Sequence, residues 1–174
     1  MHDQLQQTLQ AIEKTRCALL DELATVDAET LVAKPIPGKW SILEIVEHLV
    51  LAEREVLQNL PDPSEMVELR RSLKHHFTYP MVMMVLRCRI PVKAPSAGMI
   101  PRGTTSLDAL RSRWDESQQW LRCYVGGLDQ AGIYRAVFQH PIAGPMDLTQ
   151  AIRMGQVHVA THTRQIRRLL SLMN

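Results

Sequence analysis

"KWSILEIVEHLVLAEREVLQNLPDP", residues 39–63, carries the clearest start and stop of a helix in this chain. Ser41 is followed three residues later by Glu44, a spacing typical of a capping box, in which each side chain bonds a backbone amide at the start of a helix. The prolines at 61 and 63 cannot continue a helix. The stretch therefore predicts a helix from Ser41 to about Leu60, with His48 on its inward face. The apolar residues of that face are Ile45, Leu49, Ala52 and Val56.

Three further segments repeat apolar residues at steps of three and four, the period of one helix face. They lie at 3–26, from 105 or 106 to 126, and at 148–173, where Asp147 is the expected N-cap. Arg16 interrupts the apolar face of the first segment and predicts looser packing there. Gly155 lies inside the last segment, where a glycine costs about 1 kcal/mol relative to alanine. That cost suggests close approach by a neighbouring helix or loop.

Long connections separate these segments. Residues 61–104 are rich in proline and predict only a short helix, over 65–77, and residues 128–146 form a second irregular link. The chain shows no repeat and no low-complexity tract. We therefore expect an all-α fold, a four-helix bundle with long irregular connections, in one domain that spans 1–174. The apolar run "YPMVMMVLRCRI" at 79–90 is too short to cross a bilayer and is a candidate pocket wall or subunit contact.

The composition argues against several classes of function. The 174 residues carry a net charge of +2 with basic and acidic residues interspersed, so no concentrated basic face for nucleic acid is expected. No apolar run reaches the roughly 18 residues of a membrane span, and the N-terminus does not resemble an export signal, so no membrane partner is expected. Cys17, Cys88 and Cys123 form no CxxC pair and predict core thiols in a reducing cytoplasm.

A second stretch carries the candidate chemistry: "GQVHVATHTRQIRRLL", residues 155–170. His158 and His162 are four residues apart, which is about 6 Å of helix rise and slightly more than one turn, so their imidazoles project side by side. Both lie on the apolar face of their helix, as His48 does on its own. Two interpretations remain open. The three histidines are neutral and bonded to separate carbonyls, or they share a divalent ion such as zinc, nickel or ferrous iron that keeps open coordination positions.

Four further residues are weaker candidates for the site. Glu44, one turn before His48, and Gln165, three residues after His162, are candidates to orient the imidazoles by hydrogen bonds, although capping already explains Glu44. Thr161 is a candidate pocket residue, and the alternative interpretation is that its side chain faces solvent. His140, in the loop before the last helix, is a candidate for the mouth of the site. Its alternative is a loop residue held by backbone bonds.

Together, three stretches resemble the DinB/YfiT superfamily. "PGKWSILEIVEHLVLAE" looks like the start of its second helix, and "HPIAGPMDLTQAIRMGQVHVATHTRQIRRLL" looks like its last helix with a terminal HxxxHxxQI. "VKAPSAGMIPRGTTSLDAL" is similar in style to its approach to the third helix. The resemblance implies a bundle of up-down-down-up topology, commonly dimeric, in which His48, His158 and His162 bind nickel, zinc or a similar ion. Thr161 stands where many relatives carry another histidine.

The resemblance also implies a class of reaction, because characterised relatives include enzymes that use low-molecular-weight thiols. A metal ion with an open position lowers the pKa of a thiol and presents the thiolate to an electrophile. The first hypothesis is therefore a metal-dependent thiol S-transferase, a homodimer that acts in detoxification or stress response. The alternative is a non-catalytic metal-binding bundle that sequesters ions or serves as an interaction module. The third hypothesis is a purely structural bundle that binds no metal.

Overall fold

The structure is a computed structural model that describes residues 2–88, 90 and 96–173. This part of the chain is mostly helical and contains six α-helices, one two-stranded hairpin and three short 3₁₀ helices. The α-helices are α1 His2–Leu23, α2 Ala28–Val32, α3 Ile42–Gln58, α4 Leu73–Arg87, α5 Leu107–Gly126 and α6 Leu148–Met173. The other elements are β1 Phe138–His140, β2 Gly144–Met146, η1 Pro63–Glu65, η2 Ala97–Met99 and η3 Gly132–Tyr134.

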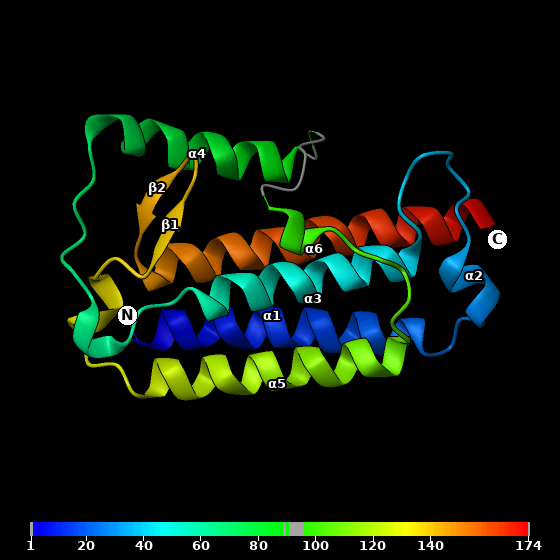
Figure 1. Cartoon of the computed structure of the whole chain (residues 1–174), viewed down its shortest axis with the longest axis horizontal. Coiled ribbons are helices and arrows are strands. Elements are labelled where there is room, and N and C mark those ends of the chain that lie inside the picture. Colours follow the sequence, from blue (N-terminus) through cyan, green and yellow to red (C-terminus); the bar gives the residue numbers. More distant parts are fainter. Residues whose placement is uncertain (1, 89, 91–95, 174) are drawn as a thin grey trace.

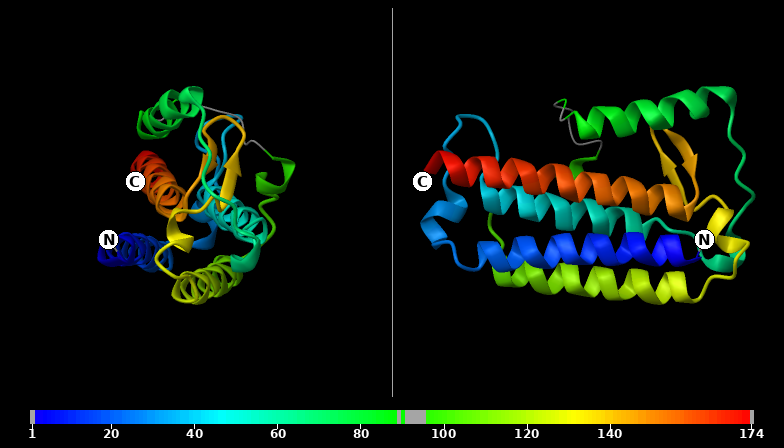
Figure 2. Two further views of the ribbon diagram at one scale, coloured as in Figure 1. Left: turned by 90° about the vertical axis from the view of Figure 1, so that its left-hand side faces the viewer. Right: turned by 180° about the vertical axis from the view of Figure 1, so that it is seen from behind.

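Four long helices, α1, α3, α5 and α6, lie side by side as a bundle (Figure 1). In Figure 1, α1 and α6 run from left to right, whereas α3 and α5 run from right to left. α1 packs against α6, and α3 packs against both α5 and α6. Figure 2 shows α4 outside these four, beside α6, and β2 contacts both α4 and α6. The bundle is therefore a four-helix core with an added outer helix and hairpin.

The two best-marked helices begin where the sequence predicts. The Ser41 side chain accepts a bond from the Glu44 amide, and the Glu44 carboxylate accepts one from the Ser41 amide, so the predicted capping box is confirmed. At the start of α6, Asp147 accepts a bond from the Gln150 amide at 2.7 Å. α1 ends at Leu23, three residues earlier than predicted, and a turn leads from it into α2.

Both long connections contain structure that the sequence analysis missed. The bounds of the helix predicted over 65–77 are wrong: α4 spans Leu73–Arg87, overlaps that range only over 73–77 and passes through Pro80. Buried Val82 fixes it, because this side chain packs beside the hairpin and α6, and its burial offsets the one backbone bond that proline removes. The link at 128–146 is not wholly irregular, because Phe138 pairs with Met146 in the antiparallel hairpin. The fold is therefore mostly helical and not strictly all-α.

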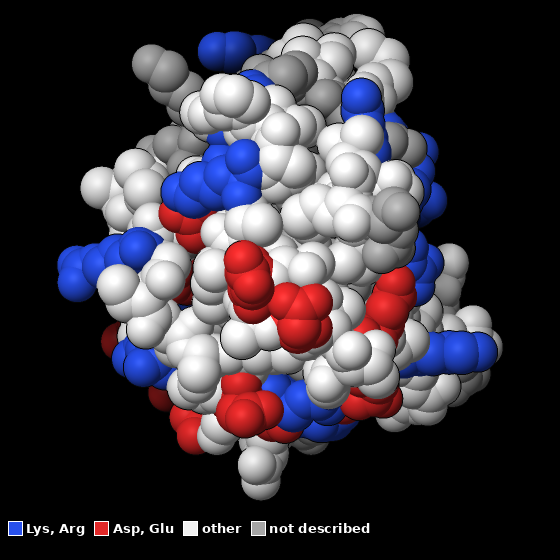
Figure 3. Space-filling view, turned by 90° about the vertical axis from the view of Figure 1, so that its right-hand side faces the viewer, with Lys and Arg blue, Asp and Glu red and all other residues white. Residues whose placement is uncertain are grey.

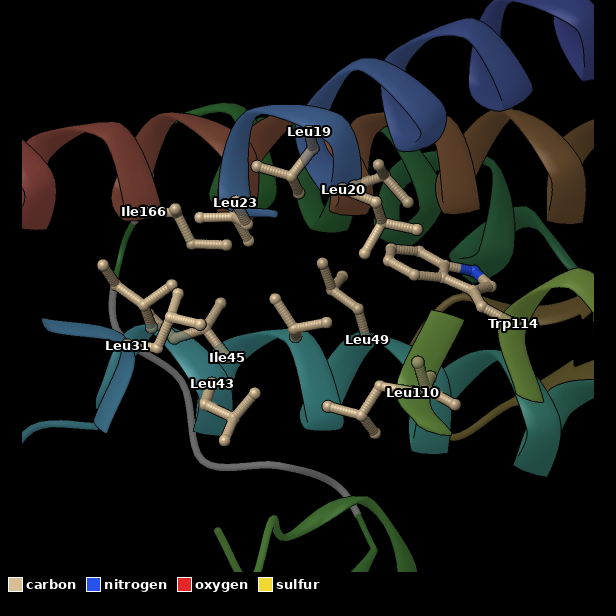
Figure 4. Close-up of a cluster of buried hydrophobic side chains, with 14 of the residues drawn as sticks. Leu19, Leu20, Leu23, Leu31, Leu43, Ile45, Leu49, Leu110, Trp114 and Ile166 are labelled. Carbon is tan, nitrogen blue, oxygen red and sulfur yellow. The ribbon is translucent and has the colours of Figure 1, made fainter. Parts of the chain in front are cut away.

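The largest buried cluster lies where α1, α3, α5 and α6 meet, with α2 covering one side (Figure 4). The Trp114 ring of α5 is fully buried there, and its indole Nε1 donates to the Glu53 carboxylate of α3 at 2.9 Å. The Gln118 amide donates to the same carboxylate at 2.7 Å. The labelled members of the cluster are Leu19, Leu20, Leu23, Leu31, Leu43, Ile45, Leu49, Leu110, Trp114 and Ile166.

Arg16 does not loosen the packing of α1, which corrects the sequence-based expectation. Its side chain is only 2% exposed, donates to Glu13 at 2.9 Å, and forms a short ion pair with Asp115 of α5. The guanidinium also lies 5.8 Å from the centre of the Trp114 ring. A planar cation with several donors satisfies both carboxylates at once, so the arginine joins α1 to α5.

Glu53 gives the fold a testable pH dependence. Burial raises the pKa of its carboxyl above the ordinary value of 4.5, although Trp114 and Gln118 donate to it. A group whose pKa is raised in the folded state binds more protons there, so its contribution to stability falls as the pH rises above 4.5. We expect Glu53→Gln to raise the free energy of unfolding by about 1–2 kcal/mol at pH 8, with a smaller gain at pH 5.

Urea unfolding at the two pH values measures this effect. Glu116→Gln, which neutralises an exposed carboxylate of α5, is the matched control and should change stability little at either pH. A Glu53→Gln variant that is less stable than the wild type at both pH values would show that the ionised carboxylate stabilises the bundle.

Gly155 faces open space, which corrects the expected close approach. A Cβ atom built at this position meets nothing within 4 Å apart from its own helix. Gly155→Ala is therefore expected to stabilise the protein by about 0.5–1 kcal/mol, because alanine loses less backbone entropy in a helix. Thermal and urea unfolding check this gain.

Gly144→Ala is the opposite case and should destabilise the protein, because Gly144 has φ +77 and a Cβ there would overlap the His75 ring.

On the face drawn in Figure 3, basic groups lie scattered around the rim with acidic groups among and between them, and no single basic field covers the face. Within the described ranges, every helix falls short of the length and apolar character that a membrane span needs.

Candidate metal centre

The structure brings together three histidines that lie far apart in the sequence. His48 comes from α3, whereas His158 and His162 come from successive turns of α6, which packs against α3. One ring nitrogen of each residue lies within 4.8 Å of those of the others. The Nε2 atoms of His48 and His158 are 3.3 Å apart. Among the described residues, this is the one group of three or more histidine, cysteine or acidic side chains with such spacing.

The His48 ring is fixed on two sides. Its Nδ1 lies 2.8 Å from the backbone carbonyl oxygen of Met99, in η2. A carbonyl can only accept, so Nδ1 carries the proton and Nε2 presents a lone pair toward the other two histidines. The Trp40 ring, immediately before the cap of α3, lies against the imidazole with centroids 4.8 Å apart. His48 is therefore held in the tautomer and orientation that a metal ligand needs.

His162 is oriented in the same way by its own helix. Its Nδ1 lies 2.9 Å from the Gln165 side-chain oxygen, which accepts the bond and leaves Nε2 free to bind a metal. The spacing of three residues places both side chains on one side of α6. Gln165 thus lies where the sequence analysis expected it to orient a ring.

The site favours neutral imidazoles. Burial lowers the pKa of His48, and burial together with the neighbouring His162 and His48 lowers the pKa of His158 well below 6.5. Burial and the charge of His48 lower the pKa of His162 to about 4. His48 is buried, whereas His158 and His162 keep partial access to solvent. At neutral pH the three rings therefore offer unprotonated nitrogens.

The donor set fits a divalent transition metal. Two imidazole nitrogens bound at about 2.05 Å in tetrahedral geometry are about 3.3 Å apart, which matches the distance between His48 and His158. The three nitrogens carry no charge, and no carboxylate of the described residues shares their cluster, so the full charge of an ion would act on any further ligand. Three histidines leave at least one position open, which is typical of catalytic sites and not of closed structural ones.

The other predicted residues lie elsewhere. Glu44 does not orient a histidine: its carboxylate accepts from the Ser41 amide and from Lys34, and these bonds hold its pKa below the usual range against the effect of burial. The Thr161 hydroxyl is buried and donates to the Leu86 carbonyl of α4 at 3.1 Å, so it joins two helices and is not solvent-facing.

His140 lies in β1, and its Nδ1 accepts bonds from the Ile142 and Ala143 amides at 3.1 and 3.0 Å, outside the histidine cluster. The interpretation of a residue held by backbone bonds therefore describes it. The prediction of three core thiols is wrong, because Cys88 and Cys123 are exposed and Cys17 is half-buried.

Two contributors to the site were not predicted from the sequence. The Met99 carbonyl carries no signal in the sequence, because every residue has one. The second contributor is Trp40, whose ring lies against the His48 imidazole. Two surface hollows of about 550 and 360 Å³ lie at opposite ends of the molecule, and none of the three histidines lines either of them.

Three comparisons relate the chain to known proteins. The sequence profile described as the DinB superfamily matches residues 11–166. No curated protein matches the chain. The solved structure of TT2238, a four-helix bundle protein, is 21% identical and aligns over 94% of this chain and 98% of that chain with a TM-score of 0.60. YfiT from Bacillus subtilis is described as a probable metal-dependent hydrolase with an unusual four-helix bundle topology. It is 18% identical and aligns over 98% of this chain and 88% of that chain with a TM-score of 0.58.

Proposed function

This chain belongs to the DinB superfamily, and from that premise we propose that His48, His158 and His162 bind a divalent metal ion and that the protein is a thiol S-transferase. The convergence of the three imidazoles from α3 and α6 is the observation that carries the proposal. Zinc, nickel and ferrous iron all accept such a nitrogen donor set. The chain 1–174 is taken as one domain, and the helix directions in Figure 1 support an up-down-down-up bundle.

The chemistry follows from the donors. A bound divalent ion supplies a positive charge that favours the ionised form of a thiol near the open position. His48 and His162 contribute neutral nitrogens because Met99 and Gln165 hold their other ring protons. The thiol proton leaves to solvent, the sulfur forms a bond to the electrophilic carbon, and the leaving group departs with its electron pair. Within the part of the chain that the structure describes, no carboxylate shares the histidine cluster, so a reaction that needs only thiol ionisation suits it better than one that needs a protein general base.

Two measurements test this function. Elemental analysis of protein purified without a metal-affinity tag should find about one equivalent of zinc, nickel or iron. A panel of low-molecular-weight thiols is then incubated with the metal-loaded protein and a chromogenic electrophile, and at least one thiol should react faster than in the protein-free control. Metal without thiol-dependent turnover would assign the non-catalytic alternative. Hydrolysis of a chromogenic substrate without thiol would instead favour a hydrolase, the class of enzyme named in the description of YfiT.

We further propose that the protein is a homodimer. We also propose that it acts in the cytoplasm, where a reducing environment would keep its three cysteines as free thiols. The outer helix α4 offers a surface for the contact, because Leu73 and Phe77 are 81% and 76% exposed and Met84 lies along the same side. Light scattering coupled to size exclusion should give twice the chain mass of 19.8 kDa. Phe77→Ser should shift the mass toward the monomer, whereas Leu172→Ser, an exposed apolar residue of α6, should leave it unchanged.

A further inference from the structure

One loop segment, residues 96–105, here called the strap, lies along α3 at the histidine cluster. It contains η2, which packs against α3, and it leads into the cap of α5 (Figure 1). At its first end the Ser96 hydroxyl donates to the Glu55 carboxylate at 3.0 Å. In its middle the Met99 carbonyl accepts the His48 Nδ1 proton. The strap is therefore the part of the chain that fixes the His48 tautomer.

The strongest anchor of the strap is Glu47, the residue immediately before His48. Its side chain is only 5% exposed, and one carboxylate oxygen accepts from the backbone amides of Arg102 and Gly103 at 2.9 and 2.6 Å. The other oxygen accepts from the Thr105 hydroxyl at 3.2 Å. A buried carboxylate is costly unless it is fully bonded, and here every bond comes from the strap. Glu47 thus has no described partner that belongs to the bundle itself.

Close fit supports the same anchoring. Gly103 adopts φ +70 and lies so near Glu44 that a Cβ atom would come within 3.2 Å of its Cγ. Gly98 lies against Glu55 even more closely, because a Cβ there would be 2.6 Å from a carboxylate oxygen. Both glycines let the backbone approach α3, so the position of the Met99 carbonyl between them is set by contacts on either side.

We propose that Glu47 is a positioning residue for the metal site: it ties the strap to α3 and so holds the Met99 carbonyl on His48 Nδ1, with Nε2 aimed at His158 and His162. The inference rests on metal binding in the proposed function and is independent of the thiol reaction. Since the coupling is reciprocal, metal bound at His48 stabilises the docked strap as much as the docked strap favours the metal.

Three variants separate this role from a general loss of structure. Glu47→Ala removes all bonds to the strap, Glu47→Gln keeps the size but loses the charge, and Thr105→Val removes only the bond from the hydroxyl. Glu68→Gln, an exposed carboxylate before α4, is the control. Helical content by circular dichroism identifies variants that remain folded. Zinc titration against a chromogenic chelator should show affinity lowered about 10-fold or more for Glu47→Ala, less for Thr105→Val, and unchanged for Glu68→Gln.

Two readouts do not depend on activity. In metal-free protein, nitrogen–proton NMR correlations of the imidazoles should show His48 as the Nδ1–H tautomer in the wild type and as a mixture of tautomers in Glu47→Ala. Hydrogen exchange of the Arg102 and Gly103 amides should slow when zinc is added to the wild type. A folded Glu47→Ala with wild-type zinc affinity and an unchanged His48 tautomer would overturn the proposal. If the wild type binds no zinc but Glu47→Ala still loses the Nδ1–H tautomer of His48, the metal site alone is refuted. The positioning of His48 by Glu47 is then still supported.

Discussion

His158→Ala is expected to lower the affinity for zinc at least about 100-fold. The variant removes one of three nitrogen donors and leaves two histidines, which hold such an ion far more weakly than three. The His158 ring is also the one whose Nε2 lies 3.3 Å from that of His48, so its loss removes a donor that faces His48 directly. Zinc titration against a chelator measures the affinity, and elemental analysis of tag-free protein measures the metal retained through purification.

The matched control is another histidine of the same chain. His140→Ala removes an imidazole that accepts bonds from the hairpin backbone outside the histidine cluster, so metal uptake should equal that of the wild type. Circular dichroism should show the same helical content for both variants, because α6 keeps its apolar face when His158 becomes alanine. Unchanged metal uptake in a folded His158→Ala would refute the three-histidine site.

Trp114→Ala is expected to have the largest effect on stability, a loss of about 4 kcal/mol. The ring is fully buried, and truncating such a side chain removes its burial and leaves a cavity. The Glu53 carboxylate also loses the indole donor at 2.9 Å, and Arg16 loses the aromatic face beside it. A buried acceptor left without a partner adds to the cost of the cavity. Urea unfolding of the metal-free protein measures the change.

Trp120→Ala is its control on the same helix. Trp120 is 45% exposed and stacks on Tyr124 at 5.1 Å, so its loss should cost less than about 1 kcal/mol. Both variants replace a tryptophan of α5 by alanine, so the difference between their losses of stability isolates the effect of burial. Similar losses for the two variants would contradict the assignment of Trp114 to the centre of the bundle.

Local signals in the sequence predicted much of the bundle. Ser41 and Glu44 form the predicted capping box, α6 has the predicted bounds, and the resemblance to the DinB superfamily is confirmed by the match over residues 11–166. Capping and helical periodicity depend on residues a few positions apart, so the sequence carries them directly. The same logic put His158, His162 and Gln165 on one side of one helix. It could not show which residues of other segments would face them.

Long-range packing decided the rest. α4 forms despite Pro80 because Val82 is buried beside the hairpin, and Arg16 is buried because Asp115 of another helix meets it. Neither contact can be predicted from residues that are close together in the sequence.

The three histidines show the division most clearly. The sequence by itself determined that they lie on apolar helix faces with the spacing of one turn in α6. Only the tertiary structure decided that these faces meet, that the Met99 carbonyl fixes His48, and that Glu47 faces the strap. The physical reason is that a helix face is set by its own residues, whereas a backbone carbonyl has no side chain to mark it and acts only where the fold brings it.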